Sequence, residues 1–487
     1  MSGTLFDLAP QTEPQRQYYF IENAAVLVKK REEAAGRPLS FHVTTFGCQM
    51  NAKDSEKMEG ILTSVGLKPC DDEKEADVVL FNTCTIRDNA NQKFYGHLGS
   101  LNGKNCKRDD RIVAVCGCMA QEKECVDKLL TSYKFVNIIF GTHNIYKLAE
   151  LLCRCLEGES PVVDVWDKPR DIVEDIPAVR KYPFKCGVNI MYGCNNYCTY
   201  CIVPYVRGNE RSRDAREIIK ECEKLASEGV KEVMLLGQNV NSYGNGIEGS
   251  ISFPKLLKEV EKVEGIERIR FMTSHPKDLS DELIEVIKNS GKICRHIHLP
   301  LQSGSSRILK AMNRRYDKEH YLELAEKIRR EIPEASITTD IIVGFPGETT
   351  EDIDDTIDVI KKVGYEGAFT FIYSPRTGTP AATMEGRPTD EWIKREFDRV
   401  LNAVQEESRR TAGRFLGNVE SVLVEEMNAQ DKKLVTGRMG NNLMVHFPGD
   451  HSLIGRIVDV RLDEYRGFYY MGTMVKGIAY DDCHVVE

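Results

Sequence analysis

From about residue 40, short apolar runs alternate with longer stretches of mixed polarity. Stretches such as NAKDSEKMEGILTSVG are typical of helices. The runs between them are strand-like: FHVTTFG, DVVLFN, RIVAVCG and VNIIFG. This alternation predicts an α/β domain with a doubly wound parallel sheet.

A second series of the same kind begins at residue 184. Its strand-like runs are CGVNIMY, EVMLLG, IERIRFM, CRHIHLP, SITTDIIVG and GAFTFIY. Six such units are too few for an eightfold barrel, so we expect a partial (β/α)6 barrel with its site at the carboxyl ends of the strands.

The last part of the chain changes character. Five short strand-like runs with Gly, Asn and Asp turns predict a small OB-like β-barrel, a common oligonucleotide-binding scaffold. Phe468, Tyr469 and Tyr470 could offer stacking faces there, although alternate residues of such a run belong to the core. The segment has more acidic than basic residues, so only its architecture favours RNA binding.

Length and composition agree with several domains in one chain of 487 residues. Residues 156–183 hold four prolines and show no periodicity, which indicates a linker. We therefore expect an N-terminal extension (1–38), a first domain (39–157), a linker (158–183), a partial barrel (184–411) and a small barrel (412–482). The start MSGTLFDLAP has no signal-peptide pattern, and no apolar run approaches the ~20 residues of a membrane helix. These features predict a cytoplasmic protein without a membrane segment.

Cys194, Cys198 and Cys201 stand in the run GCNNYCTYC, with spacing CxxxCxxC. Three thiolates on a [4Fe–4S] cluster leave one iron without a protein ligand, and such an iron can bind a substrate or cofactor. The alternative is a structural zinc site, with Cys186 as a fourth ligand from eight residues upstream.

A second candidate site follows three strands of the first domain. Cys48, Cys84 and Cys118 each come directly after a predicted strand, and the carboxyl ends of parallel strands meet at one edge of a sheet. The alternative is three unrelated buried thiols. Cys116, two residues before Cys118, is interpreted as a core residue. The other cysteines, interpreted as structural, are Cys70, Cys106, Cys125, Cys153, Cys155, Cys222, Cys294 and Cys483.

Small and polar residues follow the strands of the partial barrel and suit a polar cofactor; taken singly, each fits ordinary loop chemistry. They are Gly237, Gln238, Gln302, Ser303 and Asp340. The net charge of −9 does not indicate a nucleic-acid binder, so any RNA contact depends on local patches. One patch, residues 204–216, includes Arg207, Arg211 and Arg213, and another is RILKAMNRR at 307–315. Such runs are usually solvated faces.

The cysteine motif, with the aromatic Tyr200 before Cys201, resembles the cluster motif of the radical S-adenosylmethionine (SAM) enzymes. From about residue 39 to 481 the chain resembles their methylthiotransferase family, with an auxiliary-cluster domain, a radical SAM core and a TRAM RNA-binding domain. TTFGCQMN, NTCTIRDNA and LLGQNVNSYG are most similar to the branch that modifies dimethylallyladenosine in tRNA. Gln49, Met50 and Asn51 stand where the ribosomal-protein branch typically has Pro-Lys-Asn.

The resemblance implies two [4Fe–4S] clusters and SAM as cofactors. One cluster, on Cys194, Cys198 and Cys201, would bind and cleave SAM, and the other, on Cys48, Cys84 and Cys118, would hold an extra sulfur. One SAM would supply the methyl group, and another would supply the radical that takes the hydrogen from carbon 2 of the adenine, on the 3′ side of the anticodon. The methylthio group would then join that carbon.

The implied partners are a tRNA anticodon stem-loop carrying dimethylallyladenosine, an external electron donor and a sulfur source. The polar strand-end residues would contact SAM, and Arg207, Arg211 and Arg213 would approach the stem-loop. Two alternatives stay open: a sister enzyme acting on threonylcarbamoyladenosine or ribosomal protein, and a zinc-stabilised RNA-binding protein without catalysis.

Overall fold

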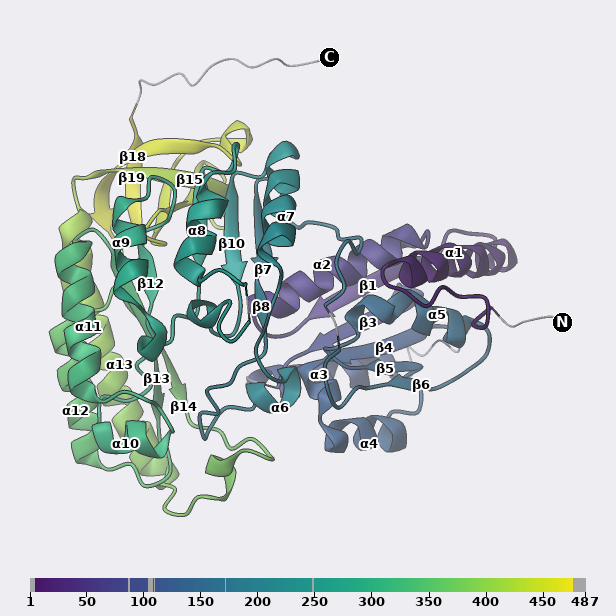
Figure 1. Ribbon diagram of the computed structural model, residues 1–487, viewed down its shortest axis with the longest axis horizontal. Coiled ribbons are helices and arrows are strands. Elements are labelled where there is room, and N and C mark those ends of the chain that lie inside the picture. The colour runs from purple at the N-terminus through teal and green to yellow at the C-terminus, as the bar shows by residue number, and fades with distance from the viewer. Residues whose placement is uncertain are drawn as a thin grey trace.

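The computed structural model describes residues 5–85, 88–103, 108, 110–170, 172–247 and 249–475. Cys106, Cys483 and the end of the predicted small barrel, 476–482, lie outside this part of the chain. Figure 1 shows three assemblies: a sheet domain in purple and blue, a central set of strands and helices in teal and green, and a small yellow β-barrel. None of the described helices is both long and apolar enough to cross a bilayer.

The first domain is a six-stranded parallel sheet of order β2-β1-β3-β4-β5-β6. The four predicted strands are present as β1 (Ser40–Thr45), β3 (Val78–Thr83), β4 (Ile112–Gly117) and β5 (Ile138–Phe140). Two edge strands were not predicted, β2 (Lys68–Pro69) and β6 (Val162–Asp164). Since β6 pairs with β5, part of the segment predicted as a linker belongs to this sheet.

Helices cover both faces of the sheet, which makes it doubly wound. On β3, Val78 and Leu80 pack on one face and Val79 and Phe81 on the other. The first face is covered by α1 (Gln15–Ala35), α2 (Gln49–Ser64) and α5 (Leu148–Leu156). The second is covered by α3 (Asp88–Leu101) and α4 (Lys123–Ser132). Cys116 lies in the first core with its sulfur 3.5 Å from that of Met58, which confirms its interpretation as a core residue.

The central region is the predicted partial barrel of six parallel strands. Its two three-stranded sheets, β11-β10-β7 and β12-β13-β14, are joined by a bridge between Ile269 and Ile293. The strands are β7 (Lys185–Asn189), β10 (Glu232–Leu236), β11 (Arg268–Phe271), β12 (His296–His298), β13 (Ser336–Val343) and β14 (Gly367–Ile372). The helices that follow them are α7 (Ala215–Ser227), α8 (Phe253–Glu261), α9 (Asp281–Asn289), α10 (Ser306–Ala311), α11 (Lys318–Glu331), α12 (Thr350–Val363) and α13 (Asp390–Ala412).

The C-terminal region is the predicted small barrel, closed by pairing of its first and fourth strands. Its strands are β15 (Val419–Met427), β16 (Leu434–Met439), β17 (Met444–Pro448), β18 (Ile457–Tyr465) and β19 (Tyr469–Met474). Arg268 and Arg270, at the start of β11, donate to barrel carbonyl oxygens of Ser421 and Met439 at 2.6 and 2.8 Å. The barrel therefore sits at the amino ends of the central strands, away from their carboxyl ends (Figure 1).

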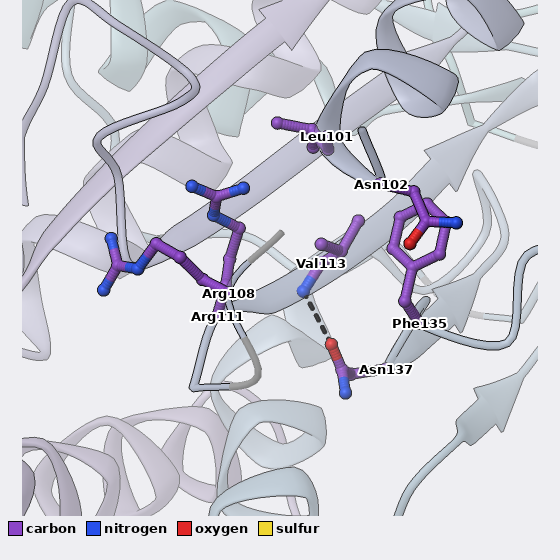
Figure 2. Close-up of a pocket in the computed structure, with 7 residues that line it drawn as sticks. All are labelled: Leu101, Asn102, Arg108, Arg111, Val113, Phe135 and Asn137. Atoms are coloured by element: carbon purple, nitrogen blue, oxygen red, sulfur yellow. Dashed lines mark hydrogen bonds between the residues drawn. The ribbon is translucent and has the colours of Figure 1, made fainter. Parts of the chain in front are cut away.

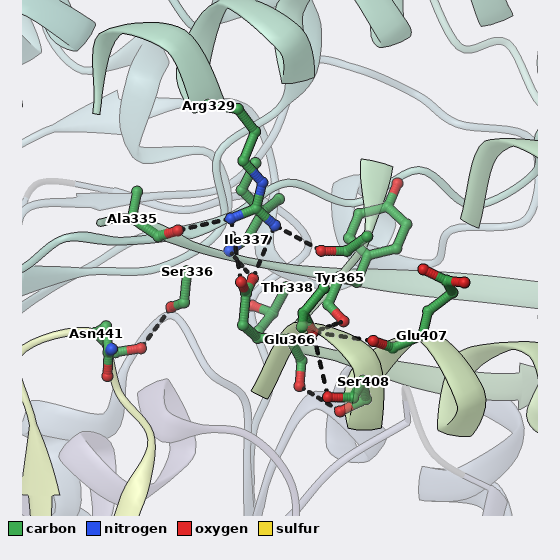
Figure 3. Close-up of polar contacts among 12 residues, drawn as sticks. Arg329, Ala335, Ser336, Ile337, Thr338, Tyr365, Glu366, Glu407, Ser408 and Asn441 are labelled. Carbon is green, nitrogen blue, oxygen red and sulfur yellow. Dashed lines mark hydrogen bonds and ion pairs between the residues drawn. The ribbon is translucent and has the colours of Figure 1, made fainter. Parts of the chain in front are cut away.

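A buried carboxylate reinforces this docking surface (Figure 3). Glu366, whose side chain is 1% exposed, pairs with Arg329 at 2.9 Å and with Arg414 at 2.5 Å, and accepts from the Ile337 amide at 2.7 Å. Arg414 lies in the short turn that leads into β15. Glu366 thus ties the barrel entrance to the amino ends of β13 and β14.

We predict that Glu366→Gln destabilises the protein by about 2–3 kcal/mol, because two guanidinium groups lose their shared counter-charge. This predicted destabilisation is smaller than the loss of a fully buried ion pair would cause. The side chains of Arg329 and Arg414 are 22% and 31% exposed, so solvent screens their charges. The thermal unfolding midpoint should fall by several degrees. Glu331→Gln, which removes an exposed partner of Lys288, is the control and should change the midpoint little. Equal shifts in both variants would contradict the prediction.

Candidate functional site

The loop that follows β7 and the short strand β8 (Met191–Tyr192) folds back on itself and brings three cysteines close together. Gly193 has φ +79°, and a Cβ there would lie 2.1 Å from the Asn209 carbonyl oxygen, so only glycine fits. The Cys194 amide donates to Gly208 at 3.1 Å, and the Cys201 amide donates to Cys198 at 2.9 Å. These bonds fold the CxxxCxxC motif into one compact turn.

The three thiols of this turn share one environment. Burial, together with the neighbouring Cys198, raises the pKa of Cys194 to about 11 and that of Cys201 to about 12. Arg314, from the segment after α10, lies with Nη1 3.4 Å from the Cys198 sulfur. It also donates to the Pro300 carbonyl at 3.0 Å, which keeps a positive charge beside the thiols.

The second predicted set also converges. Cys48 precedes α2, Cys84 follows β3, and Cys118 begins a 3-10 turn (Cys118–Gln121) directly after β4. Gly47, at φ +121°, lets Cys84 approach so closely that a Cβ on Gly47 would lie 2.9 Å from its sulfur. Burial raises the pKa of Cys118 to about 11; Arg207 lowers it, and Cys84 and Cys48 raise it.

The two sets adjoin each other. Cys118 packs against Ile202, the residue after Cys201, and against Val206 of α6 (Val203–Arg207). At the end of α6, Arg207 is 4% exposed, contacts Cys118, and donates to Asn51 at 2.9 Å and to Asp54 at 3.1 Å. The segment that follows Cys201 therefore packs directly against Cys118 of the other set.

The donor chemistry of both sets suits iron–sulfur clusters. Each set offers three thiols with no carboxylate or imidazole among them, and thiolates are the preferred ligands of such clusters. Thiols buried at raised pKa would release their protons on binding iron. Within the described residues, no group of three His, Cys, Asp or Glu side chains is arranged to hold a single metal ion.

Cys186, the alternative fourth ligand for zinc, points elsewhere. It lies within β7, with its sulfur 3.3 Å from Nζ of Lys53 on α2. Glu56 and Glu221 surround the same lysine. The structure thus uses Cys186 in the contact between the sheet domain and the partial barrel.

The polar strand-end residues divide into two groups. The Gln302 amide donates to the Asp340 carbonyl at 2.8 Å, and Ser303 follows directly. These three residues therefore lie together, Gln302 and Ser303 in the segment after β12 and Asp340 within β13. Gly237 and Gln238 lie at the end of β10 in the other half of the partial barrel, where Gln238 contacts Met50 of α2.

Two of the three arginines predicted to approach RNA are buried in internal contacts. Arg207 holds the contact just described. Arg213, 7% exposed, pairs with Glu174 at 2.6 Å and Glu221 at 2.7 Å. Phosphate contacts require accessible donors, so the structure gives these two side chains a structural role. Arg211 stays partly exposed and donates to the Arg170 carbonyl at 2.8 Å.

Sequence reasoning missed Arg314, because the run RILKAMNRR carries no signal that separates a buried arginine from a solvated one. It also gave no sign of the cavity of about 150 Å³ in Figure 2. That cavity is lined by Arg108, Arg111 and Asn137, among others, and lies near the amino end of β4. It is therefore remote from the cysteines at the carboxyl ends.

Comparisons with known proteins match each region. Residues 188–360 match the radical SAM superfamily, residues 413–475 the TRAM domain, and residues 40–141 the uncharacterized protein family UPF0004. A tRNA-2-methylthio-N(6)-dimethylallyladenosine synthase of Lachnoclostridium phytofermentans is 57% identical over 92% of this chain and 98% of its own length. The chain belongs to the family of tRNA-2-methylthio-N(6)-dimethylallyladenosine synthases. A synthase of this family from Acetivibrio thermocellus is 48% identical over 95% of the chain and 97% of its own length.

Solved structures agree with the fold of this synthase family. A radical SAM methyltransferase, TsrM, from Kitasatospora setae, with cobalamin and a [4Fe–4S] cluster bound, is 14% identical with a TM-score of 0.51. It covers 71% of this chain and 77% of its own. At this identity the similarity concerns the fold alone.

The turn after β13 holds a buried carboxyl group. Glu348, 6% exposed, accepts from the amides of Gly344 at 2.6 Å and Phe345 at 3.3 Å. Burial outweighs these bonds and raises its pKa to about 8. Between pH 4.5 and 8 the unfolded chain ionises this group while the folded protein keeps it protonated, so stability falls as pH rises through this range.

We predict that Glu348→Gln removes this loss, since an amide keeps the acceptor oxygen and does not titrate. Relative to the unsubstituted protein, the variant should gain stability between pH 5.5 and 8, at up to about 1.4 kcal/mol per pH unit. Thermal unfolding of anaerobically purified protein at both pH values measures this gain. Glu351→Gln, at the exposed first turn of α12, is the matched control. A stability difference independent of pH would contradict the prediction.

Proposed function

We propose that this chain adds a methylthio group to carbon 2 of N(6)-dimethylallyladenosine in tRNA, on the 3′ side of the anticodon. One SAM serves as methyl donor and another as radical source. The observation that carries the proposal is the direct packing of the segment after Cys201 against Cys118, which places the two three-cysteine sets beside each other. The names of its relatives support the choice of substrate.

In this proposal Cys194, Cys198 and Cys201 hold the [4Fe–4S] cluster that binds SAM, and Cys48, Cys84 and Cys118 hold a second one. The bound clusters supply one-electron and sulfur chemistry that no side chain offers, whereas the protein supplies position and electrostatics. An aromatic C–H is too weak an acid for a side-chain base, which is why such chemistry is needed.

The chain's own residues position the reaction. Arg207 and Asn51 hold the two cysteine sets at a constant separation, and Arg314 places a positive charge beside Cys198. We assign Gln302, Ser303 and Asp340, with Gly237 and Gln238 across the barrel, to contacts with SAM. Their small size and polar atoms suit a zwitterionic cofactor.

The small barrel is the proposed contact for the tRNA anticodon stem-loop. Phe468, at the turn between β18 and β19, is 79% exposed, and Tyr469 lies 4.4 Å from the ring of His446. Exposed aromatic rings of this kind stack on unpaired bases. Tyr470 is buried in the barrel core and takes no part. Of the three arginines predicted to approach RNA, Arg211 is the one that remains a candidate for a contact with the stem-loop. An external electron donor, a sulfur source and a cytoplasmic setting complete the proposal.

The decisive experiment is mass spectrometry of nucleosides from bulk tRNA of the source organism, with and without this gene. We expect 2-methylthio-dimethylallyladenosine to vanish on deletion and the unthiolated nucleoside to accumulate. Re-expression of the intact chain should restore the product. An unchanged nucleoside profile would exclude this substrate and favour the sister substrates or a non-catalytic role.

A second prediction concerns the number of clusters. Two cubane clusters correspond to about eight irons per chain. Cys118→Ala should reduce this to about four, because the second set loses one of its three ligands, while Cys194, Cys198 and Cys201 are unchanged. Cys116→Ala is the matched control. Cys116 is only two residues before Cys118, but its sulfur packs on Met58 in the core, so this variant should retain the full iron content. Anaerobic iron and sulfide analysis measures both. Zinc in place of iron, or an equal loss in both variants, would contradict the assignment.

A further inference from the structure

Two large aromatic side chains are exposed on the last strand of the partial barrel. Phe369 is 57% exposed and Phe371 is 40% exposed, although both lie within β14. β14 pairs only with β13 in the described sheet, so it forms an open edge of the partial barrel. Exposed phenylalanines within a strand lose the burial that normally stabilises them, which points to a ligand that covers them.

Both rings face the barrel interior. Phe369 pairs with Asp340 and Phe371 with Ile342, and directly paired residues of a sheet point to the same face. Ala368, the residue before Phe369, points the other way and packs on the main core with α13. Phe369 and Phe371 therefore form one apolar strip along the inner face of β14, which we call the β14 strip.

The β14 strip has polar side chains, His298 and Asp340, at one end and the cysteine turn near the other end. At its inner end, the ring of His298 meets Phe369 edge-on at 6.1 Å, and His298 lies 3.3 Å from Asp340. A bond of 3.0 Å between His298 and Thr338 fixes this ring. At the outer end, Ile342 packs into the small apolar cluster that also receives Tyr200 of the cysteine turn. A ligand on the strip would thus have polar atoms at one end and the cysteines at the other.

We infer that the β14 strip binds the dimethylallyl-bearing adenine of the RNA substrate and distinguishes it from plain adenine. This inference rests on the proposed function and names the residues that select its substrate. A flat base stacks on aromatic rings, and the five-carbon dimethylallyl group offers the apolar surface that two phenylalanines can cover. His298, held in place by Thr338, provides a hydrogen-bonding group for the polar edge of the base.

The test uses the full chain, reconstituted with iron and sulfide without oxygen. Two synthetic anticodon stem-loop RNAs carry either dimethylallyladenosine or adenosine at the target position. We expect the unsubstituted protein to prefer the alkylated RNA at least about tenfold in affinity. Phe369→Ala with Phe371→Ala should bring this ratio close to one, because the affinity for the alkylated RNA falls further than the affinity for the adenosine RNA. The matched control is Ile372→Ala, which removes an equally exposed side chain from the opposite face of β14 and should keep the preference.

Formation of 5′-deoxyadenosine from SAM without RNA is measured in parallel. A double variant that keeps the preference overturns the inference, whereas the proposed function stands if the unsubstituted protein still makes the methylthio product. A double variant that loses SAM cleavage together with the preference also overturns it, because the strip would then serve the cofactor. An unsubstituted protein that makes no methylthio product contradicts the proposed function itself. Phe369→Leu and Phe371→Leu keep apolar volume but remove the flat rings. If the double alanine variant loses iron, an unchanged affinity of both leucine variants for both RNAs overturns the inference, because stacking on the rings would then contribute nothing.

Discussion

A single buried guanidinium connects the two cysteine sets. Arg207 ends the short helix α6, which starts two residues after Cys201, and it reaches Asn51 and Asp54 in the first turns of α2. Because an unpaired charge is costly inside a protein, both amino acids of α2 must stay in place around it. Cys48 precedes that same helix, so any shift of one cysteine turn relative to the other would strain the contact of Arg207.

The two ends of the strands serve different purposes. At the carboxyl ends, loops are free to carry cysteines and polar residues, which is where parallel sheets gather their chemistry. At the amino ends, charged side chains such as Arg268, Arg270 and Glu366 attach the small barrel by bonds to its backbone or its entrance. Assembly and chemistry are thereby kept apart, and the barrel is held without occupying the space around the cysteines.

The sequence predicts the elements well and the surroundings of charged residues poorly. Strand runs and the positions of the six cysteines follow from local patterns, and the parallel topology makes each cysteine set converge. The short strands β2 and β6 were not predicted, because a strand of two or three residues is too short to show a periodic pattern of apolar and polar residues. Arg207, Arg213 and Arg314 look like solvated residues in a basic run. Their burial depends on partners far away in the chain, such as Asp54, and no local pattern encodes those partners.

The exposed phenylalanines of β14 show that burial of apolar residues, too, is not predicted by the local sequence pattern. The run GAFTFIY predicts a strand, and in a closed barrel Phe369 would be core. Its exposure arises because six strands do not close, which leaves β14 with an uncovered inner face. In the inferred complex, the open edge at β14 admits the RNA base from the side. In the inferred complex, the substrate covers the rings that the missing strands leave exposed, and so completes the barrel interior.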